Sequence, residues 1–226
     1  MSLQHTDREY EADLRQLREK LLLMGGQVEE MIRDAVRSML ERDERLAAQV
    51  AERDKLVNRG EVEVDELCLR ILALRQPTAS DLRFVTFALK AVTDVERIGD
   101  LAVNITDRVA ELSREPPLPL PPELPRMAEA VQRMLRQALD AFVRGDADAA
   151  AEVLRQDQGV DDLYREAFQR ALGLMRSNPD AVPSATGQLF VAKHLERLAD
   201  HVTNVAEMVI FMARGTDVRH PGSRTP

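Results

Sequence analysis

The stretches ERIGDLAVNITD at residues 96–107 and ERLADHVTNVAE at residues 196–207 are two copies of one pattern, and they begin 100 residues apart. Both read Glu-Arg-x-x-Asp-x-x-x-Asn-x-x-acid. Upstream, Pro77 and Pro183 each stand shortly before a copy of the motif. A long pattern that recurs at a fixed offset indicates a duplicated structural unit. The chain is therefore predicted to contain two equivalent halves.

A proline-rich segment divides these halves. Six of the 11 prolines lie in EPPLPLPPELP, near the middle of the 226-residue chain. Proline lacks a backbone donor and has a fixed φ, so we expect no helix to run through this segment. We place a first three-helix bundle at 1–115, a Pro-rich linker at 116–125, a second three-helix bundle at 126–214 and a C-terminal tail at 215–226.

Apolar residues recur at alternating spacings of three and four along both halves, which is typical of helices packed along a bundle seam. The first half predicts helices at about 7–42, 45–75 and 79–113, and the second half ends with one at about 184–214. Gly25-Gly26 inside the first helix predicts a bend or a close helix contact. The fold class is predicted as all-α, a tandem duplication with six long helices.

Composition excludes several functional classes. The chain has 31 basic and 39 acidic residues, a net charge of -8, which argues against a nucleic-acid partner. Its single cysteine, Cys68, allows neither an intramolecular disulfide nor a cysteine-based zinc site. The N-terminus is charged, and no apolar run approaches the roughly 20 residues of a membrane span. We expect a cytoplasmic protein that reaches a membrane only through protein partners.

The repeated motif places oxygen-bearing side chains on one helix face. At about 100° per residue, its Glu, Asp, Asn and final acid fall within an arc of roughly 80°. These side chains are Glu96, Asp100, Asn104 and Asp107 in the first repeat, and Glu196, Asp200, Asn204 and Glu207 in the second. Like charges at this spacing repel, so the arrangement calls for a compensating partner.

Two compensations are available. Arg97 and Arg197 could form ion pairs across to another helix. Alternatively, a hard cation could collect carboxylate and amide oxygens from the stripe, with Asp54 and Asp157 as the acids expected to face it from elsewhere in each bundle. His201 leans out of the arc and is expected to be an ordinary helix histidine. Spacing alone leaves both alternatives open.

A second apolar stripe, formed by Val85, Leu89, Val92 and Val103, lies beyond the main seam of the helix at about 79–113. Either this stripe binds a second copy of the chain, or the first helix covers it. We expect a homodimer on the first interpretation.

Three segments together resemble the PhoU family of phosphate-specific transport system accessory proteins. They are residues 75–105, 183–220 and 54–77. The resemblance implies two homologous three-helix bundles and a cytoplasmic negative regulator of inorganic phosphate uptake and of the phosphate-starvation response. It also implies two partners, the ATPase subunit of a phosphate ABC transporter and a sensor histidine kinase, and action by binding without turnover.

The resemblance implies a metal site as well, because some members of the family carry iron or zinc on a repeated Glu/Asp-x-x-x-Asp motif. In this chain the motif corresponds to Glu96 and Asp100 in the first repeat, and to Glu196 and Asp200 in the second. The second repeat departs from the fullest motif only in Ala199, where the first has glycine. A methyl group there is not expected to remove a ligand.

Rival functions have weaker support. A carboxylate-bridged di-iron enzyme draws on Glu-x-x-His pairs, and none of the four histidines lies three residues after a glutamate. Cys68 belongs to an apolar seam and is expected in the core rather than as a nucleophile. The acidic stripes have the wrong sign to bind phosphate without a bridging cation. The main alternative is a metal-free helical scaffold that uses its acidic faces to dock basic partner segments.

Overall fold

The computed structural model of the chain describes residues 3–77, 79–114, 118–216 and Val218. Six α-helices and one short 3₁₀ helix account for nearly all of these residues, and the described part of the chain contains no strand. The elements are α1 (Leu3–Glu41), α2 (Glu44–Arg75), α3 (Ala79–Arg114), α4 (Glu123–Arg144), α5 (Ala147–Ser177), η1 (Pro179–Ala181) and α6 (Val182–Arg214). The predicted all-α fold with six long helices is confirmed.

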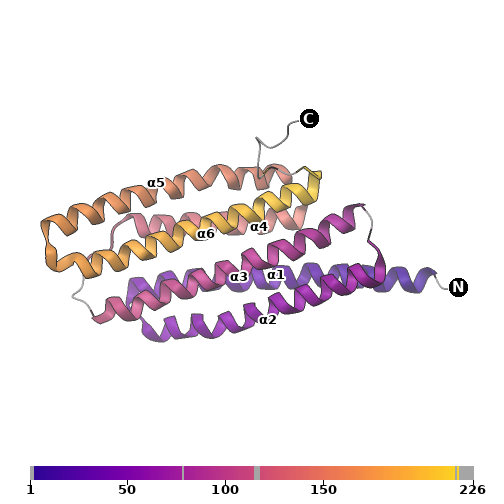
Figure 1. The fold of residues 1–226 in the computed structure, drawn as a ribbon, viewed down its shortest axis with the longest axis horizontal. Coiled ribbons are helices and arrows are strands. Elements are labelled where there is room, and N and C mark those ends of the chain that lie inside the picture. The colour runs from indigo at the N-terminus through magenta and orange to yellow at the C-terminus, as the bar shows by residue number, and fades with distance from the viewer. Residues whose placement is uncertain (1–2, 78, 115–117, 217, 219–226) are drawn as a thin grey trace.

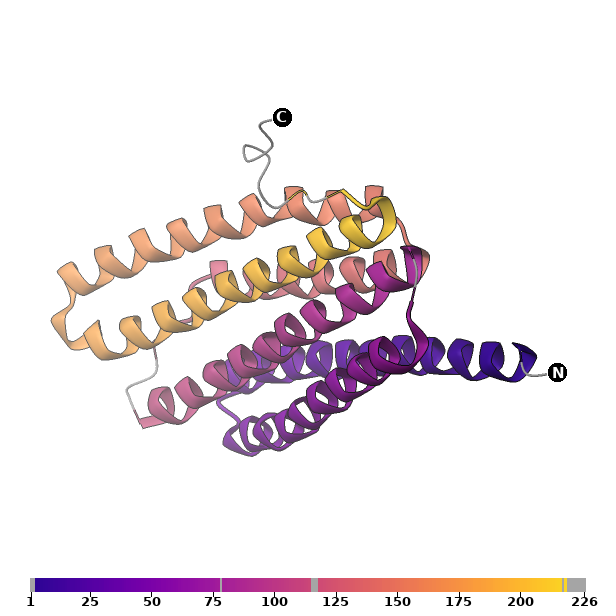
Figure 2. The same cartoon turned by 45° about the vertical axis from the view of Figure 1, so that its right-hand side comes forward.

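The helices form two three-helix bundles that lie side by side (Figure 1). Helices α1, α2 and α3 pack against one another in the first bundle, and α4, α5 and α6 do so in the second. Contact between the bundles is made by α3 against α6 and by α1 against α4, and Figure 2 shows these four helices between the outer helices α2 and α5. The two copies of the repeated motif, on α3 and α6, therefore lie at the centre of the molecule.

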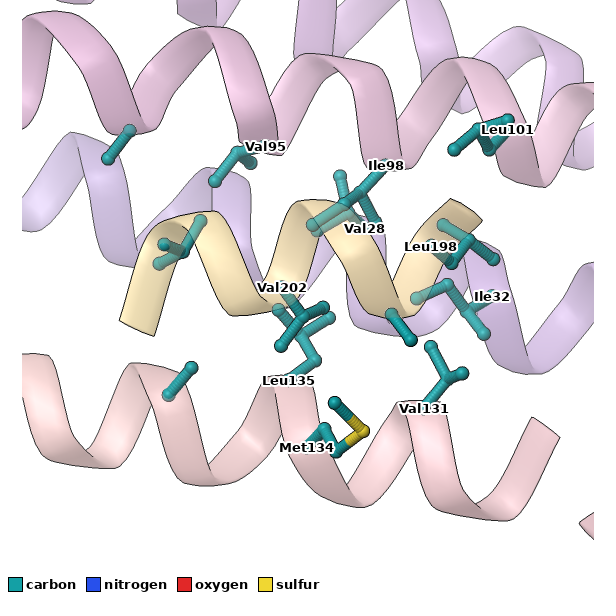
Figure 3. Close-up of a cluster of buried hydrophobic side chains, with 14 of the residues drawn as sticks. Val28, Ile32, Val95, Ile98, Leu101, Val131, Met134, Leu135, Leu198 and Val202 are labelled. Atoms are coloured by element: carbon teal, nitrogen blue, oxygen red, sulfur yellow. The ribbon is translucent and has the colours of Figure 1, made fainter. Parts of the chain in front are cut away.

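A single hydrophobic core runs through both bundles. Ile98 of α3, Leu198 of α6 and Leu135 of α4 are fully buried and meet Val28 of α1 where the bundles join (Figure 3). Burying such a side chain contributes roughly 1.5–3 kcal/mol, so this shared layer holds the halves together. The duplication thus gives two bundles but one core.

Equivalent turns begin the outer helices of both bundles. Asp43 caps α2 by accepting hydrogen bonds from two backbone N–H groups of its first turn, and Asp146 caps α5 in the same way. The residue before each cap has a positive φ, 53° at Arg42 and 62° at Gly145. Such caps satisfy donors that the first helical turn leaves without partners, so the duplication extends to local turn chemistry.

The end of the stretch expected as a linker at 116–125 is helical. Helix α4 begins at Glu123 and includes Pro125 in its first turn, where a helix tolerates proline because the N–H groups there have no intrahelical acceptor. The segment before it is fastened to α6, because Gln188 donates hydrogen bonds to the carbonyl oxygens of Leu118 and Pro119 at 3.4 and 3.2 Å.

Gly25 marks a close contact between the bundles. A Cβ atom on Gly25 would stand 2.6 Å from Cδ2 of Leu139 in α4, whereas one on Gly26 would meet nothing within 4 Å. Helix α1 runs through both glycines, so of the two predicted outcomes the close helix contact is the one that the structure shows.

The second apolar stripe of α3 is covered within the chain. Val85 and Val92 are fully buried, and Leu89 and Val103 are partly buried against the core. The covering comes from the packing of α3 against α1, α2 and α6 and not from the first helix alone. The stripe therefore gives no support to a homodimer, which stays a prediction.

Candidate functional site

The first repeat gathers four carboxylates, which we call the first acidic group: Asp54 and Glu61 on α2, and Glu96 and Asp100 on α3. Burial raises the pKa of Glu96 above its ordinary value, and repulsion from Asp100 raises it further, against an opposing effect of Arg97. Asp54, which the sequence suggested as an acid facing the stripe, raises the pKa of Glu96 slightly by charge repulsion and so lies near it.

Asp54 is the most enclosed member of this group. Its Oδ2 atom accepts a hydrogen bond of 2.9 Å from Asn58, while Oδ1 is sealed from solvent and has no partner. Oδ1 lies 3.2 Å from the position that a Cβ atom of Gly99 would take, so the missing side chain of this glycine leaves the room that the carboxylate occupies. Burial raises the pKa of Asp54.

The second repeat gathers an equivalent set, which we call the second acidic group: Asp157 and Asp161 on α5, and Glu196 and Asp200 on α6. The pKa of Asp157 is raised to about 6, chiefly by burial and then by the other three carboxylates. Burial and repulsion from Glu196 also raise the pKa of Asp200, and Lys193 opposes this shift. Both groups thus carry negative charge that is partly desolvated.

Basic side chains compensate the two groups only locally. Arg97 pairs with Asp100 of its own helix at 2.9 Å, and Lys193 pairs with Glu196 at 2.6 Å. Neither pair crosses to another helix, and within the described chain Arg197 forms no ion pair. The cross-helix ion pairs considered for Arg97 and Arg197 are therefore not formed, and the compensation consists of pairs within one helix, a kind of pair that contributes little to stability.

The acidic groups have the oxygen donors that a hard cation prefers, but their side chains do not point to one common position. Carboxylate oxygens are suitable ligands, and the sealed Oδ1 of Asp54 lacks a partner. However, among the described residues, no three Asp, Glu, His or Cys side chains come close enough together to hold a metal ion. A cation could bind either group only after side chains turn toward a common point.

The remaining stripe residues separate into different surroundings. Asn204 donates a hydrogen bond of 2.9 Å to Oδ1 of Asp94, in the other repeat, and Nδ1 of His201 lies 2.8 Å from the same oxygen. The side-chain amide of Asn204 therefore forms part of the contact between α3 and α6. Asn104 and Glu207 are half-buried, and Asp107 is exposed. His201, expected to be an ordinary helix histidine, takes part in this contact between the repeats.

Sequence reasoning missed the polar pairs where α3 crosses α6. Asp94 lies between the helices and binds Asn204, whereas the equivalent position in the second repeat carries His194. Burial lowers the pKa of His194, and Arg108 and Arg197 lower it further, against Asp107. The sequence does contain one sign of these pairs: Asp94 in the first repeat is replaced by His194 at the equivalent position of the second.

The fold and the acidic groups define a class of protein: an all-helical duplication in which each half presents carboxylates from its motif helix and a neighbouring helix. No helix among the described residues has the length and apolar character needed to cross a membrane. The PhoU domain matches the chain twice, over residues 21–109 and 124–209.

Relatives of known sequence match over almost the whole chain. The phosphate-specific transport system accessory protein PhoU homolog of Pseudomonas aeruginosa is 42% identical over 219 residues, which cover 96% of this chain and 90% of that protein. The phosphate-specific transport system accessory protein PhoU of Escherichia coli is 38% identical over 218 residues, with the same two shares covered. This chain therefore belongs to the PhoU family.

Solved structures agree with this assignment. The crystal structure of PhoU from Pseudomonas aeruginosa has a TM-score of 0.88 at 41% identity and covers 92% of this chain and 100% of that one. The phosphate transport system regulatory protein PhoU from Streptococcus pneumoniae has a TM-score of 0.87 at 29% identity, covering 92% and 99%. The family resemblance predicted from the motifs is confirmed.

Proposed function

We propose that this chain is a cytoplasmic accessory protein of phosphate transport that represses phosphate uptake and the phosphate-starvation response when phosphate is plentiful. The observation that carries the proposal is the match of the whole duplicated fold to relatives named as phosphate-specific transport system accessory proteins, at 42% and 38% identity across 96% of the chain. Sequence identity at this level across both bundles supports a shared role better than a likeness of fold alone does.

The protein acts by binding rather than by turnover. Its only thiol, Cys68, is fully buried, and burial raises the pKa of this thiol to about 12, so it is a poor nucleophile. Relatives named as accessory and regulatory proteins support the same role. The partners that we propose are the ATPase subunit of a phosphate ABC transporter and a sensor histidine kinase, which would bring the chain to the membrane.

We further propose that the acidic groups bind a metal ion such as iron or zinc. In the first repeat Glu96, Asp100 and Asp54 would hold it, and in the second Glu196, Asp200 and Asp157 would do so. Such an ion would supply positive charge that neutralises the desolvated carboxylates. The sealed oxygen of Asp54 and the raised pKa of Asp157 support this, because both carboxylates lack a full counter-charge.

A pull-down tests the proposed function. The tagged chain is captured from cells grown with ample phosphate and from phosphate-starved cells, and metal content is measured on the same material. We expect the transporter ATPase and the kinase to be recovered, with their amounts changing between the two conditions. Recovery of neither partner in either condition would contradict the proposed regulation.

The metal-free scaffold is the second candidate, and the lack of three convergent ligands among the described residues favours it. The double variant Glu96→Ala with Asp100→Ala separates the candidates. Loss of bound metal in this variant supports a metal site, whereas a metal content that stays unchanged, with partner capture lost, supports docking of basic partner segments on the acidic faces. Lys90→Ala, at an exposed position of the same helix, is the control for a general surface change.

A further inference from the structure

Helices α3 and α6 cross antiparallel, so equivalent positions of the two repeats build the two ends of the crossing. Contacts near one end join Asp94 to Asn204, and contacts near the other join Arg108 to Phe190. Position 94 corresponds to 194 and position 204 to 104, because the repeat offset is 100 residues. The two ends can therefore be compared directly.

At the first end, the protein supplies its own anion. Oδ1 of Asp94 accepts a hydrogen bond of 2.9 Å from the side-chain amide of Asn204, and it lies 2.8 Å from Nδ1 of His201. The Asp94 side chain is 19% exposed, so it is largely removed from water, and its Oδ1 atom has these two neighbours. This end of the crossing is satisfied.

At the second end, two buried nitrogen atoms have no hydrogen-bond partner. His194 takes the place of the aspartate, and its Nδ1 atom is buried without a hydrogen-bond partner. Nε of Arg108, on the facing helix, is buried and unpartnered as well. Asn104, the counterpart of Asn204, makes no hydrogen bond among the described residues. We call His194, Arg108 and Asn104 the donor cluster.

Buried polar atoms without partners are costly, and a native protein leaves few of them. Two such atoms on facing helices, where the other end of the crossing holds a carboxylate, indicate that an acceptor is missing from this end. Besides Arg108, the exposed Arg197 also lowers the pKa of His194. The nearby acids are Asp107, which is exposed, and Glu111, which is paired with Nη1 of Arg108 at 2.6 Å.

A groove open to solvent reaches Arg108 at this end. It has a volume of about 430 Å³, lies between α3 and α6 and is lined by Arg108, Glu111 and Phe190 among others. The guanidinium of Arg108 stands over the Phe190 ring at 5.1 Å, so the groove leads to the side chain that carries one of the unpartnered donors.

We propose that the donor cluster binds a small free oxyanion such as inorganic phosphate. Oxygens of the anion would accept hydrogen bonds from Nδ1–H of His194, from Nε–H of Arg108 and from the side-chain amide of Asn104. At the other end, the carboxylate of Asp94 accepts a hydrogen bond from Asn204 in a similar way. The acidic stripes have the wrong sign for such a ligand, but Asn104 alone of the donor cluster belongs to a stripe, and its amide is uncharged. The site goes beyond the proposed binding of partners and metal, and it does not depend on either.

Titration of the full chain tests the site. Sodium phosphate, sulfate and acetate are added in turn at constant ionic strength, with sodium chloride as the control, and binding is followed by calorimetry and by the NMR signal of the Asn104 side-chain amide. We expect phosphate and sulfate to give saturable binding and to shift that signal, and chloride to do neither. A response to acetate alone, or an equal response to chloride, would overturn the proposal.

Three variants locate the site. Arg108→Gln removes one charge-assisted donor and is expected to weaken phosphate binding at least about tenfold. Arg97→Gln removes the same charge from the same helix outside the cluster and should leave the affinity within about twofold. His194→Asp gives this end its own carboxylate, as at Asp94, and should abolish anion binding while the protein stays folded by circular dichroism.

Equal weakening in Arg97→Gln and Arg108→Gln would show general attraction of anions to positive charge and would overturn the proposed site. Phosphate affinity at the original level in a folded His194→Asp protein would overturn it too. If His194→Asp does not fold, the comparison of the two arginine variants still decides. This test leaves the proposed function untouched, because partner capture is measured separately and does not involve added anions.

Discussion

Removing the charge of Asp157 is predicted to stabilise the protein at neutral pH. The pKa of this carboxyl is raised from 3.8 to about 6, chiefly by burial and then by the other acids of its group. A pKa difference of this size between the folded and unfolded chain corresponds to at most about 3 kcal/mol of folding free energy. The side chain is only partly buried, and screening by solvent reduces the expected gain to about 1 kcal/mol for Asp157→Asn.

The sign follows from linkage. Below about pH 4 the carboxyl is protonated in both the folded and the unfolded chain, so its contribution to stability is fully present there. As the pH rises through about 6, the carboxyl ionises in the folded protein and that contribution is lost. The stabilising effect of Asp157→Asn should therefore be absent near pH 4, develop between about pH 4 and 6, and be complete above about pH 7.

Urea unfolding followed by circular dichroism, in buffer with a chelator, measures this effect near pH 4 and near pH 7.5. Asp140→Asn is the control, because Asp140 is an exposed aspartate in helix α4 and its change should shift stability by less than about 0.5 kcal/mol. A variant Asp157→Asn that is less stable than the original protein at pH 7.5, or whose effect is the same at both pH values, would refute the reasoning.

Three further substitutions test the packing that positions the site, each by urea unfolding. Gly25→Ala brings a Cβ atom to 2.6 Å from Leu139 and should destabilise by about 1 kcal/mol, whereas Gly26→Ala, with no neighbour within 4 Å, should stabilise by about 0.5–1 kcal/mol; equal effects would contradict the close contact. Asp94→Ala should lower stability by about 1–2 kcal/mol. Asn204→Ala should cost much less in the Asp94→Ala background than in the original protein, because the two side chains share one hydrogen bond. Equal costs of Asn204→Ala in both backgrounds would count against that bond. Glu123→Ala should lower stability more than Glu166→Ala does, since Glu123 is 2% exposed and binds Arg170 through several hydrogen bonds, while Glu166 is exposed; the reverse order would disprove the role of this pair.

The helices and their duplication could be predicted because they depend on local rules. Spacings of three and four define the buried face of a helix without knowledge of its neighbours, and the repeated motif assigns α3 and α6 to equivalent positions. Asp54 and Asp157 stand 103 residues apart, close to the 100-residue offset of the motif, and the structure places both of them near the motif acids of their own bundle.

Contacts between the two bundles could not be predicted in the same way. A helical wheel places Asn204 on the face of Asp200, but it cannot say that Asp94 of the other repeat reaches that amide. The stripe around Val92 left two interpretations open for the same reason, and its covering comes from packing within the chain. Pairings across a helix crossing depend on tertiary arrangement, which sequence periodicity does not contain.

The central claim is repression of the phosphate-starvation response, and the most direct measurement is the expression of a phosphate-starvation gene in cells that lack this chain. In phosphate-rich medium we predict that the gene stays on in the deletion strain and is switched off again when the chain is restored. Normal repression in the deletion strain would contradict the account.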